Sequence, residues 1–232
     1  MIITASISLF LGLVLQLSAP AQSSAAQASR GYGAVEGRVF DERGQPISDA
    51  TVYAFRPDKP SAGLRHEVHT DATGSFFLDT VEPGLNRICA VDEKEYYPDA
   101  NATFYDSAVP YPEVNVHEGK VVRGVIIRVG PKAGRLVARV VDARTGQPIE
   151  RGGVTFYEAR SSQDYMGTSL RRGGRFNLLV PSTKPFRMRV WAHGYTTWYY
   201  GKEGTQAGAE PLRLSPGETR VVIIRLHPAK SE

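Results

Sequence analysis

The 232-residue chain has a globular composition, with 41% hydrophobic, 9% aromatic and 22% charged residues, which excludes a disordered protein. Its 23 glycines and 15 prolines favour turn-rich β-structure over helix. Cys89 is the only cysteine, so an intramolecular disulfide and a cysteine metal cluster are excluded. The net charge of +4 is not accompanied by any nucleic-acid-binding motif, and no nucleic-acid partner is expected.

Residues 1–28 are predicted to be a signal peptide followed by a polar spacer. The apolar run from Ile7 to Leu17 has the length of a signal-peptide core and is too short to span a bilayer. Small residues suited to cleavage follow at Ala19–Ala21 and Ala26–Ala28. A retained membrane anchor is the alternative, but the Ser/Ala/Gln spacer favours cleavage. We therefore expect an exported protein (periplasmic, outer-membrane associated or extracellular) whose mature chain has no integral membrane span.

The rest of the chain contains an internal repeat. Residues 36–47 match residues 138–149, and an offset of 102 residues separates Gly44 from Gly146. A period of this size indicates duplicated domains and not a solenoid. The predicted domains span residues 33–130 and 134–228. Because the linker between them is very short, we expect the domains to abut.

Each copy has the pattern of a β-sandwich, because short alternating segments are separated by dense Gly, Pro and Asp turns. In chain order, the predicted strands are 35–41, 50–55, 75–78, 88–91 and 121–129, then 136–141, 154–157, 175–179, 186–191 and 221–226. Asp71 is expected to cap a turn in which Gly74 supplies a positive φ. Phe77 and Phe176 are expected to enter the two cores.

The first copy carries a recognisable motif. Its form is Gly-x-Val-x-Asp-x-x-Gly-x-Pro-Ile-x-x-Ala-x-Val at residues 37–52, followed by Thr-Asp-Ala-Thr-Gly-Ser-Phe at residues 70–76. This motif resembles the carboxypeptidase regulatory-like domain. The resemblance implies an all-β fold of two tandem transthyretin-like (prealbumin-like) β-sandwiches, similar to carbohydrate-binding starch-domain folds. The second copy departs from the pattern, having Leu170 and Arg171 in place of Thr-Asp. The resemblance also implies a non-catalytic domain that accompanies other domains.

A search for catalytic and metal-binding residues yields no assignment. His66 and His69 are spaced as a ligand pair, but residues i and i+3 of a strand point to opposite faces. The carboxylates of Asp92, Glu93 and Glu95 could serve a glycosidase, although a solvated loop explains them more simply. No catalytic residue, no metal and no cofactor are therefore predicted, and an enzyme is the least favoured class.

The segment after Lys184 holds the strongest candidate for a binding surface. On a strand, Phe186, Met188 and Val190 would share the core face, which leaves Arg187, Arg189 and Trp191 on the other. The candidate ligand or partner surface comprises Arg187, Arg189, Trp191, Tyr195, Trp198, Tyr199 and Tyr200, with a weaker counterpart at Tyr96 and Tyr97. Trp and Tyr beside Arg are enriched in binding surfaces. The alternative is burial of the aromatics at the end of the sandwich, like a tyrosine corner.

These observations favour a non-catalytic, exported structural or interaction protein of a bacterial cell envelope. Its partner would be an unknown envelope protein or a glycan bound in trans. The alternative is a carbohydrate-binding module that uses the aromatic cluster between Trp191 and Tyr200. The formal charge is −5 over residues 30–131 and +9 over residues 132–232. This difference predicts either contact between an acidic first domain and a basic second domain or attraction of the second domain to an anionic surface. The alternative is that both charged faces are simply solvated.

Overall fold

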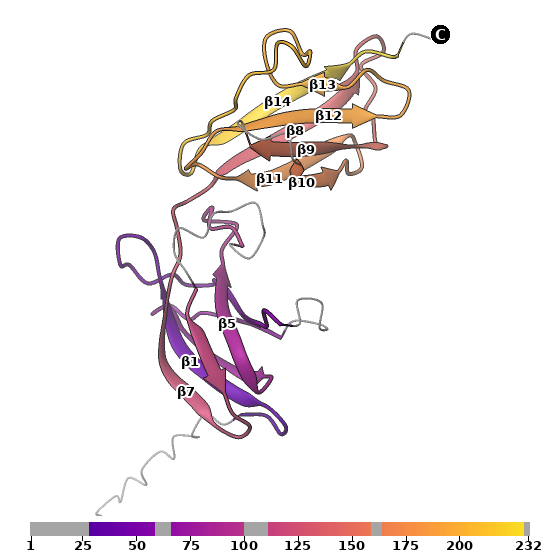
Figure 1. The fold of residues 1–232 in the computed structure, drawn as a ribbon. Helices are drawn as coiled ribbons and strands as arrows, with labels where there is room; N and C mark the ends of the chain where they lie inside the picture. The colour runs from indigo at the N-terminus through magenta and orange to yellow at the C-terminus, as the bar shows by residue number, and fades with distance from the viewer. Residues whose placement is uncertain (1–27, 59–65, 100–110, 159–163, 230–232) are drawn as a thin grey trace, which may run out of the picture.

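The computed structural model describes residues 28–58, 66–99, 111–158 and 164–229. Within these ranges the regular secondary structure consists of β-strands, and no helix able to cross a bilayer occurs there. The predicted all-β fold is confirmed. The strands form two β-sandwiches that follow one another along the chain (Figure 1). Residues 1–27, which hold most of the predicted signal peptide and spacer, lie outside the described residues.

The first sandwich contains two facing sheets. Its strands are β1 (Gly33–Phe40), β2 (Thr51–Phe55), β3 (Glu67–His69), β4 (Ser75–Val81), β5 (Gly84–Val91), β6 (Glu113–Val116) and β7 (Val121–Arg128). One sheet has the order β4-β1-β7 and the other β3-β2-β5-β6. Every second side chain of these strands points into the space between the sheets, because successive residues of a strand alternate in direction. The fully buried core includes Val35, Val39, Leu78 and Ile127 from one sheet, and Val52, Ile88 and Ala90 from the other.

The second sandwich has the same strand order. Its strands are β8 (Gly134–Asp142), β9 (Gly152–Glu158), β10 (Asp164–Ser169), β11 (Arg175–Val180), β12 (Phe186–Ala192), β13 (Trp198–Tyr199) and β14 (Thr219–Leu226). The sheets are β11-β8-β14 and β10-β9-β12-β13. In both sandwiches the last strand pairs in parallel with the first, β7 with β1 and β14 with β8. The core is centred on Phe156, whose ring makes edge contacts with Phe176 and Phe186.

Aspartates hold the turn that follows the first strand of each sandwich. Asp41 Oδ1 accepts hydrogen bonds from the backbone N–H groups of Arg43 (2.9 Å) and Gln45 (2.7 Å). Asp142 Oδ1 accepts equivalent bonds from Arg144 (2.7 Å) and Thr145 (2.9 Å). A short polar side chain that satisfies its own turn is a common use of aspartate. The repeated aspartates therefore have a structural role.

The expectation that Phe77 enters the first core is wrong. Phe76 is the buried residue, 4% exposed, and Phe77 is half-buried on the opposite face of β4. Gly74 ends the preceding turn with a φ of 74°, and Phe76 pairs with Gly37 of β1. This register sends Phe76 and Leu78 inward, and the alternation of the strand then forces Phe77 outward. Phe176, at 2% exposure, does enter the second core as expected.

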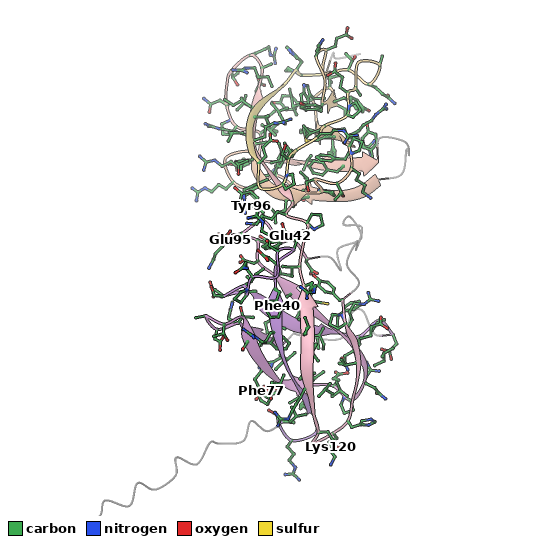
Figure 2. The ribbon with its side chains drawn as sticks, turned by 90° about the vertical axis from the view of Figure 1, so that its left-hand side faces the viewer. Phe40, Glu42, Phe77, Glu95, Tyr96 and Lys120 are labelled. Atoms are coloured by element: carbon green, nitrogen blue, oxygen red, sulfur yellow. The ribbon has the colours of Figure 1, made fainter. Side chains whose placement is uncertain are left out.

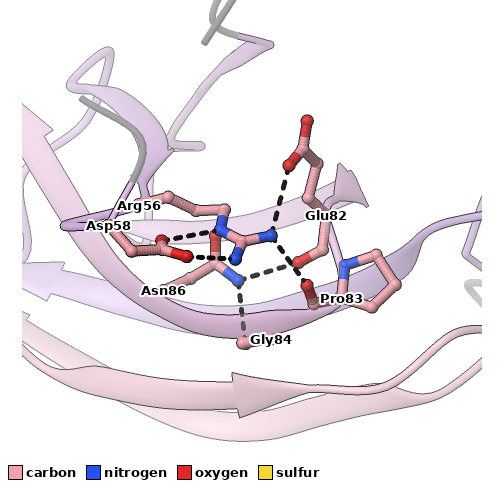
Figure 3. Close-up of polar contacts among 6 residues, drawn as sticks. All are labelled: Arg56, Asp58, Glu82, Pro83, Gly84 and Asn86. Carbon is pink, nitrogen blue, oxygen red and sulfur yellow. Dashed lines mark hydrogen bonds and ion pairs between the residues drawn. The ribbon is translucent and has the colours of Figure 1, made fainter. Parts of the chain in front are cut away.

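The turn between β4 and β5 is held by Arg56 and Asn86 (Figure 3). The Arg56 guanidinium donates to both carboxylate oxygens of Asp58, at 3.0 and 2.6 Å, and to the carbonyl oxygen of Pro83 at 3.1 Å. Buried Asn86 donates from Nδ2 to the carbonyl oxygens of Glu82 (2.8 Å) and Gly84 (3.0 Å). These hydrogen bonds stabilise the turn at Glu82-Pro83-Gly84, which therefore has a structural role.

Direct contacts join the two sandwiches. Figure 2 shows Glu42, Glu95 and Tyr96 at the end of the first sandwich that faces the second. The hydroxyl groups of Tyr96 and Thr219 are 2.7 Å apart, and the Arg135 guanidinium lies 4.8 Å from the centre of the Tyr96 ring. Lys132 forms an ion pair with Glu95 at 3.1 Å. Hydrogen bonds and a cation–π contact thus cross the junction beside the covalent linker.

Candidate functional site

Strand β12 presents different chemistry on its two faces. Phe186, Met188 and Val190 are buried in the second core, at 2% exposure or less. Arg187 and Arg189 are half-buried on the outer face, and Trp191 is 49% exposed. The outer face of β12 therefore carries two arginines and one open tryptophan along a strand in the interior of a sheet, where the backbone is held on both sides.

The Trp191 indole lies flat over Gly153 of the neighbouring strand β9. Trp191 and Gly153 are paired in the β9–β12 register. A Cβ atom built on Gly153 would lie 3.0 to 3.1 Å from Nε1, Cε2 and Cζ2 of the indole. Nearly equal distances to three bonded ring atoms place that position above the ring plane. One side of the indole thus packs against the sheet at Gly153, while the residue as a whole is 49% exposed.

The tryptophan forms one wall of a shallow depression of about 520 Å³. Its lining residues are Arg189, Trp191, Ala192, His193, Thr197 and Tyr199. Tyr199 of β13 pairs with Arg189 of β12, so the strand register itself brings these two side chains to one surface. We call this depression the Trp191 face. It combines an aromatic platform with a few polar groups, which is the usual composition of a small-ligand site.

Trp198 and Tyr200 belong instead to the edge of the core. Both pack against the buried residues of the second sandwich, and their rings meet edge to face with centroids 6.4 Å apart. A Cβ atom on Gly204 would lie 2.7 Å from Cδ1 of Trp198, so this indole is covered by the loop after β13. The aromatic cluster predicted from the sequence is therefore divided, with Trp191 and Tyr199 on the Trp191 face and Trp198 and Tyr200 against the core.

Tyr195 links the two sheets at one end of the second sandwich. Its hydroxyl donates to Asp142 Oδ2 at 2.9 Å, while the other oxygen of Asp142 holds the turn after β8. Backbone N–H bonds from Thr145 and Arg144, followed by the Tyr195 hydroxyl, hold the pKa of Asp142 below its usual range. Tyr195 therefore has a structural role. Its hydroxyl bonds to a side chain far along the sequence and not to the nearby backbone, as it would in a tyrosine corner.

We expect Asp142→Asn to make the stability of the second sandwich less dependent on pH in the acidic range. Because the folded pKa of Asp142 is depressed, its contribution is fully present above the unfolded value of about 3.9 and is lost as the pH falls through the folded pKa. Urea midpoints followed by tryptophan fluorescence between neutral and acidic pH measure this dependence. Tyr195→Phe should retain most of the dependence, since the two backbone bonds remain. Parallel pH profiles for wild type and Asp142→Asn would contradict the assignment.

Tyr96 and Tyr97 lie at the junction between the sandwiches and not near the Trp191 face. Tyr96 has a φ of 69° and contacts Thr219 and Arg135 of the second sandwich. Tyr97 is 3% exposed, and its hydroxyl donates to Glu42 Oε2 at 2.8 Å. Burial and the bond to Glu42 raise the pKa of the Tyr97 phenol. The structure thus places this pair in contacts within the chain.

A second depression, of about 470 Å³, lies on the outer face of the first sandwich. Lys94 Nζ is 2.7 Å from Asp49 Oδ2, and Tyr53 donates to Asp99 Oδ1 at 2.5 Å. The hydrogen bond from Lys94 lowers the pKa of Asp49. Asp92, an acid noted in the sequence, accepts bonds at 3.1 Å from the backbone of Lys94 and Glu95 and so holds a turn. No group of three or more potential metal ligands occurs among the described residues.

Sequence reasoning missed Ala192, His193 and Thr197 of the Trp191 face, as well as Gly153, against which the indole packs. Gly153, His193 and Thr197 carry no motif, and they meet only because β9, β12 and the segment before β13 are neighbours in one sheet. The Gly152-Gly153 pair was the available signal. Two glycines at the start of a strand indicate that something lies close to the backbone, but they do not identify the side chain that does so.

The fold and this face define a β-sandwich protein with an aromatic-walled depression on one sheet. Residues 34–124, from β1 into β7, match the family model of the carboxypeptidase regulatory-like domain. The resemblance inferred from the motif is confirmed for this segment, which contains most of the first sandwich. A comparison with curated protein sequences gives no match.

Solved structures similar to the chain include three bacterial proteins. The Bacillus anthracis TIE protein is 13% identical (TM-score 0.34; 85% of this chain, 34% of that one). A streptococcal ancillary pilin is 14% identical (TM-score 0.31; 87% and 63%). The shaft pilin SpaA from Lactobacillus rhamnosus GG is 9% identical (TM-score 0.34; 87% and 99%). The chain thus spans about a third of the first protein and less than two thirds of the second.

Proposed function

We propose that this protein is a non-catalytic structural and interaction protein of the cell envelope, exported and built from two carboxypeptidase regulatory-like modules. The family match of the first sandwich supports a structural or interaction role. The observation that carries the proposal is the Trp191 face, where a half-exposed indole sits on a rigid sheet beside Arg189. An exposed aromatic beside an arginine is typical of residues that dominate binding energy.

The acidic side chains described above have structural partners, which supports a non-catalytic role. Asp41, Asp71 and Asp142 hold backbone turns. Asp58 pairs with Arg56, and Asp49 pairs with Lys94. A general acid or base must face a bound substrate. Carboxylates occupied in this way stabilise the sandwiches instead.

The contacts at the junction support an arrangement in which the two modules act as one elongated unit. Arg135 and Thr219 of the second module contact Tyr96 of the first, and Lys132 of the linker pairs with Glu95. Ser182 Oγ also donates to the backbone carbonyl oxygen of Lys132 at 2.6 Å. An acidic loop and basic residues meet here, in line with the opposite charges of the two halves. Such a unit would hold the Trp191 face at a defined distance from the N-terminal end.

A carbohydrate-binding module is the second candidate function. The flat seating of Trp191 on Gly153 favours it, because a sugar ring can stack only on an aromatic face that is open and fixed. The candidate site is narrower than the full cluster from Trp191 to Tyr200, since Trp198 and Tyr200 pack against the core.

The proposal is tested by locating the tagged full-length protein in fractions of the cells that produce it. We expect a processed form, shortened near residues 21–28, in the envelope fraction. Trp191→Ala should raise the share released into the soluble exported fraction about tenfold, because an aromatic anchor of this kind contributes about 1.4 kcal/mol or more.

Arg139→Ala is the control for Trp191→Ala. It also removes an exposed side chain of the second sandwich, but Arg139 lies in β8 of the opposite sheet. It should fractionate as the wild type does. Recovery of an unprocessed protein in the cytoplasm would contradict export. Equal envelope retention of wild type and Trp191→Ala would show that another surface makes the contact.

A further inference from the structure

The polar groups around the Trp191 indole are biased toward hydrogen-bond donors and positive charge. Arg189 contributes a guanidinium, which can only donate. His193, Thr197 and Tyr199 can donate and, through ring nitrogen or hydroxyl oxygen, accept. Among the described side chains, none of those lining the depression is a carboxylate. A ligand rich in acceptors, and above all one with negative charge, fits this lining.

The second module as a whole also carries a net positive charge. Residues 132–232 carry a formal charge of +9, against −5 for residues 30–131. Long-range attraction therefore brings anionic ligands toward the second module. Arg187 lies next to Arg189 along the outer face of β12, so the positive charge continues along the strand from the tryptophan. A planar guanidinium binds carboxylate groups in two-point geometry.

The aromatic platform adds a second requirement. The Trp191 residue is 49% exposed, its indole packs against Gly153 on one side, and a side chain at position 153 would displace it. An open, supported ring of this kind binds a flat apolar surface of a ligand. The axial C–H face of a pyranose ring is such a surface, and its hydroxyl groups remain free for Thr197 and Tyr199.

We propose that the Trp191 face is a binding site for an acidic polysaccharide, with a uronic-acid ring stacked on Trp191 and its carboxylate held by Arg189. This inference rests on the proposed interaction function and specifies its partner. The occupant is a glycan and not a protein because the depression is small and shallow and pairs one supported ring with a few polar groups. A typical protein–protein interface would cover a far larger area, about 800 Å² per partner.

The test compares two forms of one polymer. Polygalacturonate and its fully methyl-esterified form share the same sugar ring, but only the first is charged. Titration of the purified mature protein, followed by calorimetry and tryptophan fluorescence in the presence of a chelator, should show binding of polygalacturonate at least tenfold tighter than of the ester. Added salt should weaken the charged interaction.

Three variants assign the binding to residues. Trp191→Ala should weaken polygalacturonate binding about tenfold or more. Gly153→Val should have a similar effect while keeping the tryptophan, because its side chain occupies the place of the indole. Arg189→Gln should remove the preference for the charged polymer. Arg139→Ala removes the same charge from the opposite sheet and should leave binding unchanged. Unaltered urea midpoints for each variant establish that the module is folded.

The inference is overturned if both polymers bind equally, which would indicate a site for neutral sugars. It is also overturned if Arg139→Ala weakens binding as much as Arg189→Gln, since the attraction would then be diffuse. Absence of binding to either polymer, together with envelope retention that depends on Trp191 and is lost when the envelope is treated with protease, would identify a protein partner. In that case the proposed interaction function would stand and the glycan inference would fail.

Discussion

Phe156→Ala is expected to destabilise the second sandwich by about 3–5 kcal/mol, the usual loss when a buried phenylalanine is truncated. Phe156 is fully buried, and its ring contacts Phe176 at a centroid distance of 6.5 Å and Phe186 at 5.6 Å. These three rings come from both sheets, so the cavity would lie between them and could not be filled by one side chain. Since a domain is typically stable by only about 5–15 kcal/mol, a large part of its stability would be lost.

Urea denaturation followed by tryptophan fluorescence measures this effect, because Trp191 and Trp198 both lie in the second sandwich. Phe77→Ala is the matched control. It truncates a half-buried phenylalanine of the first sandwich and should leave the tryptophan transition in place. A loss of less than about 1 kcal/mol for Phe156→Ala would mean that the core collapses around the gap, contrary to the close packing expected of an interior.

Gly174→Ala is expected to have the second large effect, through the backbone. Gly174 has a φ of 67°, and an added Cβ would lie 2.4 Å from the carbonyl oxygen of Val140. The left-handed conformation alone costs about 1–2 kcal/mol for a residue with a side chain. The clash adds to this, because the obstacle is the backbone of β8 and cannot rotate away.

Gly146→Ala separates the two contributions. Gly146 has a similar φ of 72°, but nothing lies within 4 Å of its added Cβ. Gly146→Ala should lose only the stability that the unfavourable left-handed conformation costs. The difference in urea midpoint between Gly146→Ala and Gly174→Ala therefore measures the cost of the clash. Gly74→Ala should behave like Gly174→Ala in the first sandwich, where the Val39 carbonyl oxygen is 2.6 Å from the added Cβ. Equal midpoints for Gly146→Ala and Gly174→Ala would show that β8 moves aside without loss.

Local patterns explain why the fold class could be predicted. The Asp-centred turns, the positive-φ glycines and the two-residue alternation act over a few residues, and each is visible in the chain itself. Gly74 was therefore recognisable as a turn glycine, and Phe186, Met188 and Val190 as one buried face. The error at Phe77 arose where two phenylalanines are adjacent. Alternation requires that one of them face outward, but it does not say which one.

The same distinction between local pattern and tertiary arrangement applies to the candidate site. Local periodicity was enough to predict the all-β fold and the outward direction of Arg189 and Trp191, and a short motif was enough to recognise the carboxypeptidase regulatory-like domain of the first copy. Which aromatics stay open follows from the three-dimensional arrangement of the strands and loops. Trp191 is open because its strand partner is Gly153, whereas Trp198 lies beneath Gly204 in a later loop. Whether a side chain is exposed depends on which residue of a neighbouring strand or loop lies over it. The spacing of residues within one segment carries no information about that neighbour.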